Sequence, residues 1–293
     1  MLYNLSRSST KTTNIISQIG ARCYRMASLF ARYRSTEEYY DIDRRIRGVW
    51  WGRPFDRLVN SVLRLAGTPR IAPPEGRIAI DMHVHTLCSY CSFTRPEELL
   101  RRAALLGLAG VCIMDHHTAR GYGMALEAAR PLMEKGILPE DFLILKGIEY
   151  STAEGHICGL FCDGDVPFKA AGAREAVDMI LDMGGLPIAA HPFHRTGIGE
   201  LAETLEGLAG VEIYSGSVLR EQEYLRGARI TTGAARLGSS DSHFVSTCGM
   251  CYTLFPDTVK TPEDVRRSIL AADTEPAETA CYTSVRRLAG GMK

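Results

Sequence analysis

From Arg77 onward, short apolar runs alternate with segments in which apolar residues recur every three or four positions. Runs of the first kind predict strands, and segments of the second kind predict amphipathic helices. The expected strands are 77–84, 110–114, 142–148, 156–161, 186–190, 210–214, 229–238 and 251–254. The expected helices are 95–107 (with Thr94 and Glu97 as a capping box), 122–134, 172–183, 198–207, 217–226 and 262–272. Repeated β-α units of this length predict a parallel sheet or barrel.

Residues 36–76 depart from this pattern and predict a helical extension followed by a proline-rich linker. Four apolar residues recur at helical spacing after Pro54, namely Phe55, Leu58, Val62 and Leu65. We expect this apolar face to dock on the domain that follows. The alternative is binding to a nucleic acid or a membrane surface through Trp50, Trp51 and the neighbouring arginines.

The formal net charge of zero hides two segments of opposite sign. Residues 1–77 carry 14 Lys/Arg and 6 Asp/Glu, a net charge of +8, so the remainder carries −8. The first 36 residues contain six Lys/Arg and no acidic residue, which is the composition of an organellar transit peptide. A solvated, flexible basic tail over residues 1–35 and a translation start at Met26 are the alternatives.

Composition also restricts the cellular setting. No apolar run approaches the ~18 residues of a membrane-spanning helix, so we expect no transmembrane segment. The nine cysteines are an odd number in a chain too large to depend on disulfides. Free thiols in a reducing compartment follow, and we expect a cytoplasmic protein unless the basic tail directs it to an organelle.

The histidines carry the chemical signal. All eight fall within short motifs, most of them at the end of an expected strand. The motifs are Asp81-Met-His83-Val-His85, Asp115-His116-His117, Gly155-His156, His191-Pro-Phe-His194 and Asp241-Ser-His243. Neutral imidazole is the commonest protein ligand for zinc and related metals, and the carboxyl ends of barrel strands are where catalytic groups gather. The pattern predicts a multinuclear metallohydrolase, with Asp81, His83 and His85 on one face of the first strand.

The order of these motifs, with Gly147-Ile-Glu149 between the second and third, resembles the PHP (polymerase and histidinol phosphatase) family of metal-dependent phosphoesterases. The resemblance covers about residues 78–280. It implies a distorted (β/α)7 TIM-like barrel over residues 77–285, with two or three divalent metal ions (Mn, Zn or Fe) at its rim and no organic cofactor. The implied metal ligands are His83, His85, His116, Glu149, His156, His191, Asp241 and His243.

Within this set, the resemblance assigns roles to each ligand. His83, His85 and Asp241 would surround one metal together with Glu149. Glu149 would bridge this metal to a second one, held by His156 and His191. His116 and His243 would belong to a third.

The third metal site departs from the family pattern. The first family motif usually continues to an Asp, or sometimes a His, that ligates the third metal, and Tyr90 stands at that position here. A phenol with a pKa near ~10 is a poor ligand at neutral pH, so we expect the third site to be weak or absent. Cys88 or Cys91 could compensate, since thiolates bind zinc well. Together with Cys248 and Cys251 they could instead form a four-cysteine cluster, and small buried thiols are the plainer alternative.

The implied reaction is hydrolysis of a phosphomonoester or of a nucleotide phosphodiester by a metal-bridging hydroxide, with Glu149, His191 and Asp241 as the catalytic residues. His194, Arg195 and Arg120 are candidates to bind the substrate phosphate, and His194 or His117 to protonate the leaving group. For both histidines a surface location is the alternative. The expected partner is a small phosphorylated substrate or a short oligonucleotide, and nothing in the sequence indicates the oligomeric state.

Two other functions compete with this one. An amidohydrolase also opens with an HxH motif, but it uses a carboxylated lysine as its bridge, where this chain offers Glu149. A PHP-like barrel that has lost ligands would act as a non-catalytic binding or regulatory module, since fold alone never establishes activity.

Overall fold

The computed structural model describes residues 70–162 and 172–291, and these form a mixed α/β structure around one sheet. Its strands are β1 (Arg77–Val84), β2 (Gly110–His116), β3 (Leu143–Ser151), β4 (His156–Leu160), β5 (Leu186–Ala189), β6 (Gly210–Ser215), β7 (Ala235–Ser239), β8 (Cys251–Pro256) and β9 (Glu275–Glu278). The order across the sheet is β7-β6-β5-β4-β3-β2-β1-β8-β9. Strands β1–β3 are parallel to one another, as are β5–β7, whereas β4, β8 and β9 are antiparallel to their neighbours.

The sheet curls until β7 meets β1 and β8, so that it forms a nearly closed barrel. A parallel bridge joins Val84 at the end of β1 to Ser242 beyond β7. At the other side, Thr253 of β8 donates its hydroxyl to the Gly238 carbonyl of β7 at 2.8 Å. These bonds bring the carboxyl ends of β1 and β7 together although 159 residues separate Asp81 from Ser240 in the chain. The barrel expected from the sequence is confirmed.

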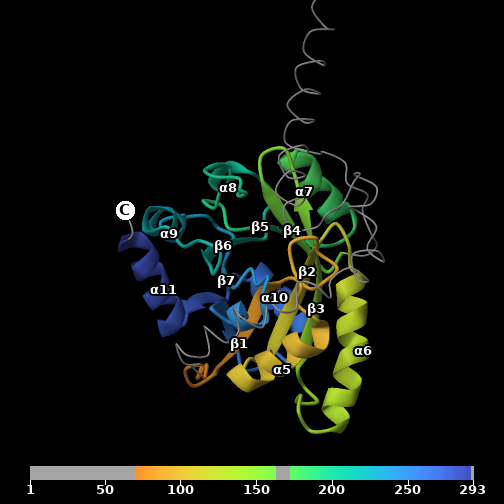
Figure 1. Cartoon of the computed structure of the whole chain (residues 1–293). Helices are drawn as coiled ribbons and strands as arrows, with labels where there is room; N and C mark the ends of the chain where they lie inside the picture. The colour runs from red at the N-terminus through yellow and green to blue at the C-terminus, as the bar shows by residue number, and fades with distance from the viewer. Residues whose placement is uncertain (1–69, 163–171, 292–293) are drawn as a thin grey trace, which may run out of the picture.

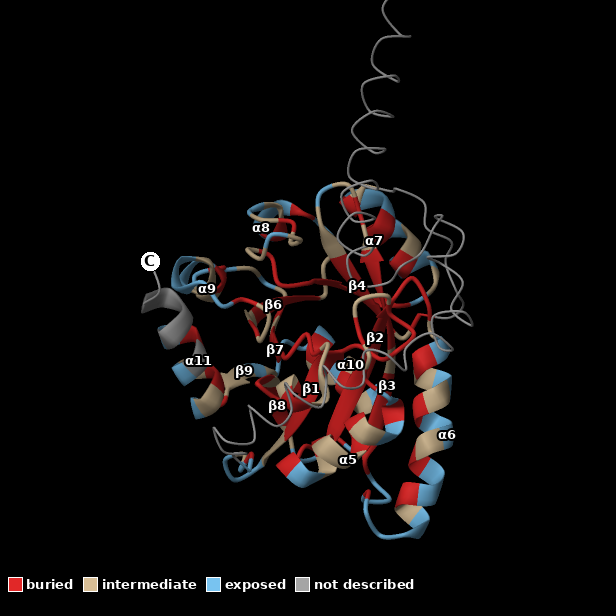
Figure 2. Ribbon diagram, viewed as in Figure 1, coloured by how far each residue is buried: buried red, intermediate tan, exposed pale blue. Residues whose placement is uncertain are grey.

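Helices surround the barrel (Figure 1). They are α5 (Pro96–Leu106), α6 (Arg120–Glu134), α7 (Ala173–Asp182), α8 (Leu201–Thr204), α9 (Glu221–Ala228), α10 (Pro262–Leu270) and α11 (Ala280–Gly291), with a short 3-10 turn at Val245–Thr247. Each longer helix buries one side and exposes the other, as the alternation of red and pale blue along α6 in Figure 2 shows. In α5 the buried residues Leu99, Ala103 and Leu106 recur at helical spacing, which is why this segment forms an amphipathic helix.

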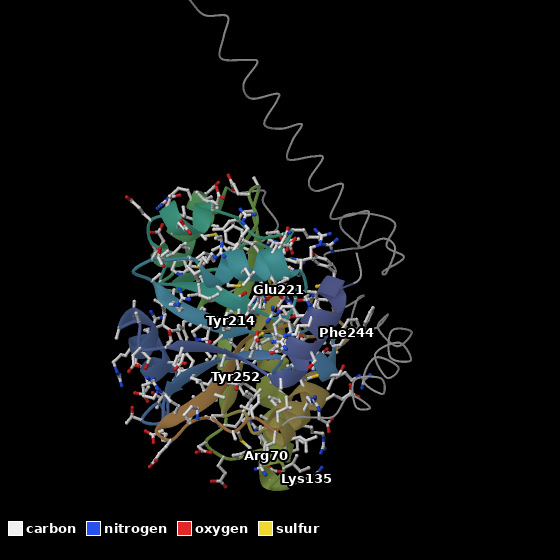
Figure 3. The ribbon with its side chains drawn as sticks, turned by 90° about the vertical axis from the view of Figure 1, so that its left-hand side faces the viewer. Arg70, Lys135, Tyr214, Glu221, Phe244 and Tyr252 are labelled. Carbon is white, nitrogen blue, oxygen red and sulfur yellow. The ribbon has the colours of Figure 1, made fainter. Side chains whose placement is uncertain are left out.

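Apolar side chains fill the space between strands. Ile80, Met82, Met114 and Leu145 belong to one buried cluster with residues of β4, β5 and β7. A separate cluster packs α5 and α6 against the outer side of β1–β3. Burial of this kind is the main stabilising contribution to such a domain, at roughly 25 cal/mol per Å² of apolar surface. Side chains also cover the face turned to the viewer in Figure 3, where Tyr214 of β6 and Tyr252 of β8 are labelled.

Several local predictions were wrong. The capping box at Thr94 does not form, because Arg95 is the N-cap of α5 without a side-chain bond and the Thr94 hydroxyl instead donates to the His243 carbonyl. The helix expected over 198–207 is reduced to the single turn α8, and the strand expected over 229–238 begins only at Ala235. Strand β9 and helix α11 were not anticipated.

The predictions for the basic tail and for nearly all of the helical extension lie outside the described residues. Within the described part of the chain, no helix has both the length and the apolarity needed to span a membrane. No disulfide joins any two of the described cysteines. The four-cysteine cluster is also not formed there: Cys88 contacts Met124 through sulfur, and none of the grouped potential metal ligands unites these thiols.

Candidate metal centre

The two histidines of the HxH motif face the same point from the end of β1. The Glu212 carboxylate accepts a hydrogen bond from His83 Nδ1 at 2.9 Å. Ser89 Oγ donates to Asp115 at 2.6 Å and therefore accepts from His85 Nδ1 at 2.9 Å. With both Nδ1 atoms protonated, each Nε2 presents a lone pair, and the two Nε2 atoms lie only 3.0 Å apart.

Glu149 lies at the centre of the histidines and is almost wholly buried. Its Oε1 is 2.6 Å from His156 Nδ1 and 3.2 Å from His191 Nε2. Its Oε2 is 3.1 Å from His116 Nδ1 and 3.3 Å from His85 Nε2. The two oxygens of one carboxylate thus face two different groups of imidazoles.

Asp241 closes the cluster from the loop after β7. Its Oδ1 is 3.2 Å from His85 Nε2, and its Oδ2 is 3.7 Å from His191 Nε2. Its own carbonyl accepts the Nδ1 hydrogen of His243 at 2.8 Å. Side chains from β1, β2, β3, β4 and the loops after β1, β5 and β7 therefore converge at one end of the barrel.

The backbone at two of these residues is strained. His191 has φ 28° and Asp241 has φ 47°, both in the left-handed region that side chains other than glycine rarely adopt. Such conformations cost of order 1–3 kcal/mol each and gather at functional sites. Glu212 helps to hold the first of them, because its Oε2 accepts the His191 backbone N–H at 2.8 Å.

Burial and neighbouring charges shift the pKa values of the cluster in opposite directions. Burial raises the pKa of Glu149, but His156 and His116 outweigh it and hold this pKa well below its usual range. Burial lowers the pKa of His85, yet its hydrogen bonds to Asp241 and Glu149 raise it to about 9. Burial also drives the pKa of His116 well below its usual range. Without a metal, protons on some imidazoles balance the carboxylate charges.

Divalent metal ions fit this arrangement. Two facing imidazole lone pairs 3.0 Å apart repel each other unless a cation or a proton lies near both. The buried Nδ1 atoms of His116 and His156 have no hydrogen bond of acceptable geometry. Potential ligand atoms gather within 4.8 Å of one another in the groups His83/His85/Glu149 and His116/Glu149/His156. Imidazole with carboxylate is a donor set that zinc, manganese and iron all accept.

Known proteins share parts of this sequence. Residues 230–274, which include Asp241 and His243, match the family model described as PHP-associated. An uncharacterized protein of Methanocaldococcus jannaschii, MJ1587, is 32% identical over 147 residues, which cover 46% of this chain and 80% of that protein. The chain contains a PHP-associated region and resembles the PHP family.

Two solved structures have a fold similar to that of this chain. A two-domain protein from Bacteroides vulgatus, containing a predicted PHP-like metal-dependent phosphoesterase, matches with a TM-score of 0.53 and 17% identity, over 71% of this chain and 68% of that one. PsfC from Pseudomonas syringae matches with a TM-score of 0.50 and 19% identity, over 73% of this chain and 96% of that one.

The structure thus brings together the side chains for which the PHP motifs predicted metal binding. Those gathered are His83, His85, His116, Glu149, His156, His191, Asp241 and His243. Asp81, expected on the same face as His83, belongs to none of the groups of potential ligands and accepts the N–H groups of Ser240 and Gly249. The register of β1 against β2 shifts between Asp81 and Val84, which ends the simple alternation of faces.

The candidate substrate-binding residues lie outside this cluster. His194 is half-buried, with its ring 5.2 Å from that of His191 and its Nδ1 2.8 Å from Thr196 Oγ1. Burial and the neighbouring His191 lower the pKa of His194 to about 4. Arg195 and Arg120 are exposed, in the turn after β5 and at the start of α6. Whether they bind a phosphate stays a prediction.

Three supporting residues were missed at the sequence level. Glu212 orients His83, while Asp115 and Ser89 orient His85 through a chain of two hydrogen bonds. A Cβ on Gly121 of α6 would overlap Asp115, so α6 packs directly against the side chain that ends this series of hydrogen bonds. The role of Glu212 could have been suspected from the sequence, because Glu212 is the one charged residue in the predicted strand segment 210–214. Nothing in the sequence marked Ser89, since serine is common in loops.

Proposed function

We propose that this protein is a metal-dependent phosphoesterase that hydrolyses a phosphomonoester or a nucleotide phosphodiester. The observation that carries the proposal is the position of Glu149. One of its oxygens faces His156 and His191, and the other faces His85 and His116. A carboxylate between two sets of imidazoles is suited to hold two cations at a short separation.

The residues divide naturally between two ions. His83, His85 and Asp241 would hold one with Glu149, and His156 and His191 would hold the other. When bound, such ions polarise phosphoryl oxygens and lower the pKa of water so that it can attack at neutral pH. Glu212 and Ser89 accept the Nδ1 hydrogens of His83 and His85, so that each Nε2 would be left to bind a metal ion.

His194 is better suited to bind phosphate than to donate a proton to the leaving group. With its pKa lowered to about 4, it is neutral at pH 7 and seldom carries the second proton that a general acid gives up. Metal ions nearby would lower that pKa further. We therefore place His194 and Arg195 as phosphate contacts, with Arg120 as a third.

The experiment is a hydrolysis assay on protein purified without chelator. Phosphomonoesters and short oligonucleotides are offered with Mn²⁺, Zn²⁺ or Fe²⁺, and amide substrates are included as a comparison. We expect phosphate release that Glu149→Ala removes and that Glu140→Ala, at an exposed position, retains. Hydrolysis of amides alone would favour an amidohydrolase. Metal binding without any hydrolysis would favour the non-catalytic module.

A further inference from the structure

A second group of potential ligands lies beside the Glu149 cluster and includes a cysteine. One ligand atom each from His85, Cys91, His116 and His243 lies within 4.8 Å of the others. These residues come from the loop after β1, the end of β2 and the loop after β7. The sequence alone left open whether Cys88 or Cys91 compensates for the ligand missing at Tyr90. Cys88 is directed to Met124, and Cys91 joins the histidines.

Three of the four residues, Cys91, His116 and His243, each offer one potential ligand atom to a separate ion. His85 Nδ1 is bonded to Ser89, and its Nε2 lies toward Glu149 and Asp241. His243 donates from Nδ1 to the Asp241 carbonyl, which leaves its Nε2 as a ligand atom. His116 belongs both to this group and to the group with Glu149 and His156, and its Nδ1 lies 3.1 Å from Glu149 Oε2. A thiol and two imidazoles remain, and three protein ligands with one open position are typical of catalytic zinc.

The loop that carries Cys91 is fixed to the segment that carries His243. The Ser92 hydroxyl lies 3.1 Å from the His243 carbonyl and 3.3 Å from the His85 carbonyl. Thr94 donates its hydroxyl to the same His243 carbonyl at 3.2 Å. The backbone next to Cys91 and the backbone of His243 are therefore held together by several hydrogen bonds, as supporting residues hold metal ligands in other proteins.

Tyr90 has a different use in this loop. Its ring stacks on His116, with 4.7 Å between the ring centroids and 14° between the planes. Stacking fixes the plane of the His116 ring. The residue at the missing ligand position thus positions another ligand, and the neighbouring residue supplies the donor atom.

We propose that Cys91, His116 and His243 bind a third divalent cation through a thiolate and two imidazoles. Binding replaces the thiol hydrogen with the metal, forms a sulfur–metal bond and releases one proton to solvent. Thiolate is a soft ligand, so this site selects zinc, iron(II) or cobalt(II) over manganese or magnesium. The inference concerns metal binding and holds whichever ester, if any, the enzyme hydrolyses.

The test uses cobalt(II) as a coloured probe. Full-length protein is stripped with a chelator, reloaded with Co²⁺ and examined for a sulfur-to-cobalt charge-transfer band in the near ultraviolet, together with bound metal per chain. We expect the band in the unmodified protein and in Tyr90→Phe and Cys281→Ser. Cys91→Ser should lose the band and about one equivalent of metal, with circular dichroism unchanged.

Three outcomes would overturn the inference. They are the absence of the band in cobalt-loaded unmodified protein, its persistence in Cys91→Ser, and its loss in Cys158→Ser alone. Cys158 serves as the comparison because it lies with His83 and Glu212 in another group of potential ligands. Two bound metals with no thiolate band would refute this inference alone. A chain that binds no metal at all would refute the proposed function as well.

Discussion

The middle and the carboxyl ends of the barrel strands are equally buried but chemically opposite. Ile80 and Met114 in the middle are enclosed by apolar side chains, and they need no partner beyond close packing. His83 and Glu149 lie near the carboxyl ends of β1 and β3. They are also almost fully buried, but they are polar and lie within 3.6 Å of each other. Burying such groups costs free energy unless they are paired or coordinate metals. The first region stabilises the fold, and the second is suited to bind cations.

The largest expected effect is that of Glu149→Ala, which should impair the polar cluster without weakening the apolar core. It removes the carboxylate that faces both sets of imidazoles, so kcat/KM for phosphate release should fall at least about a thousandfold, or about 4 kcal/mol. Metal per chain should fall as well, while the unfolding midpoint of the metal-free protein should not decrease. Retention of activity within about tenfold of the unmodified enzyme would show that Glu149 is not the bridge.

Leu145→Ala tests the opposite region. Leu145 is fully buried in the apolar cluster, so its truncation should lower the free energy of unfolding by about 2–5 kcal/mol. Metal per folded chain should remain unchanged. The matched control is Leu105→Ala, at a leucine that is 67% exposed, where urea unfolding should change by less than about 0.5 kcal/mol. Loss of metal from folded Leu145→Ala protein would mean that the two regions are not separable.

Glu212→Gln tests the support behind the ligands. The amide can still pair with the His83 ring, but it no longer balances charge as the carboxylate does. Metal affinity should weaken by about 10–100-fold, as for other residues that orient metal-bound histidines. Glu206→Gln, at an exposed glutamate of the preceding loop, is the control. Equal affinities for the two variants in competition with a chelator would remove Glu212 from the site.

The smallest effect is expected from Ser89→Ala. This change breaks the chain from His85 to Asp115, but Asp115 keeps its two bonds to Thr86. The loss should be about 1 kcal/mol in the urea unfolding of metal-free protein, with a modest weakening of metal binding. Ser284→Ala, on the exposed side of α11, is the comparison. A loss as large as that in Leu145→Ala would place Ser89 in the structural core rather than in the support of a ligand.

The sequence predicted these two regions unequally. Apolar runs located most strands within a few residues, and the sequence motifs at their ends predicted the side chains that the structure gathers around Glu149. Glu212 and Asp81 were harder, because their partners are distant in the chain and depend on which strands become neighbours. The prediction of Thr94 as a helix cap was wrong because its hydroxyl donates to the His243 carbonyl. Capping rules consider only residues close in sequence and cannot anticipate this contact. Docking of residues 36–76, the domain limits and the phosphate-binding arginines stay predictions.

The central claim is that the strand ends form a multinuclear metal centre around Glu149. Anomalous diffraction from crystals of protein purified without chelator, recorded on both sides of the absorption edge of each candidate metal, tests it most directly. The account predicts at least two peaks. Two of them should lie roughly 3.5–4 Å apart, one beside His156 and His191 and the other beside His83, His85 and Asp241, with a Glu149 oxygen near each. An anomalous map without peaks at these positions, in crystals of protein supplied with Mn²⁺, Zn²⁺ or Fe²⁺, would contradict it.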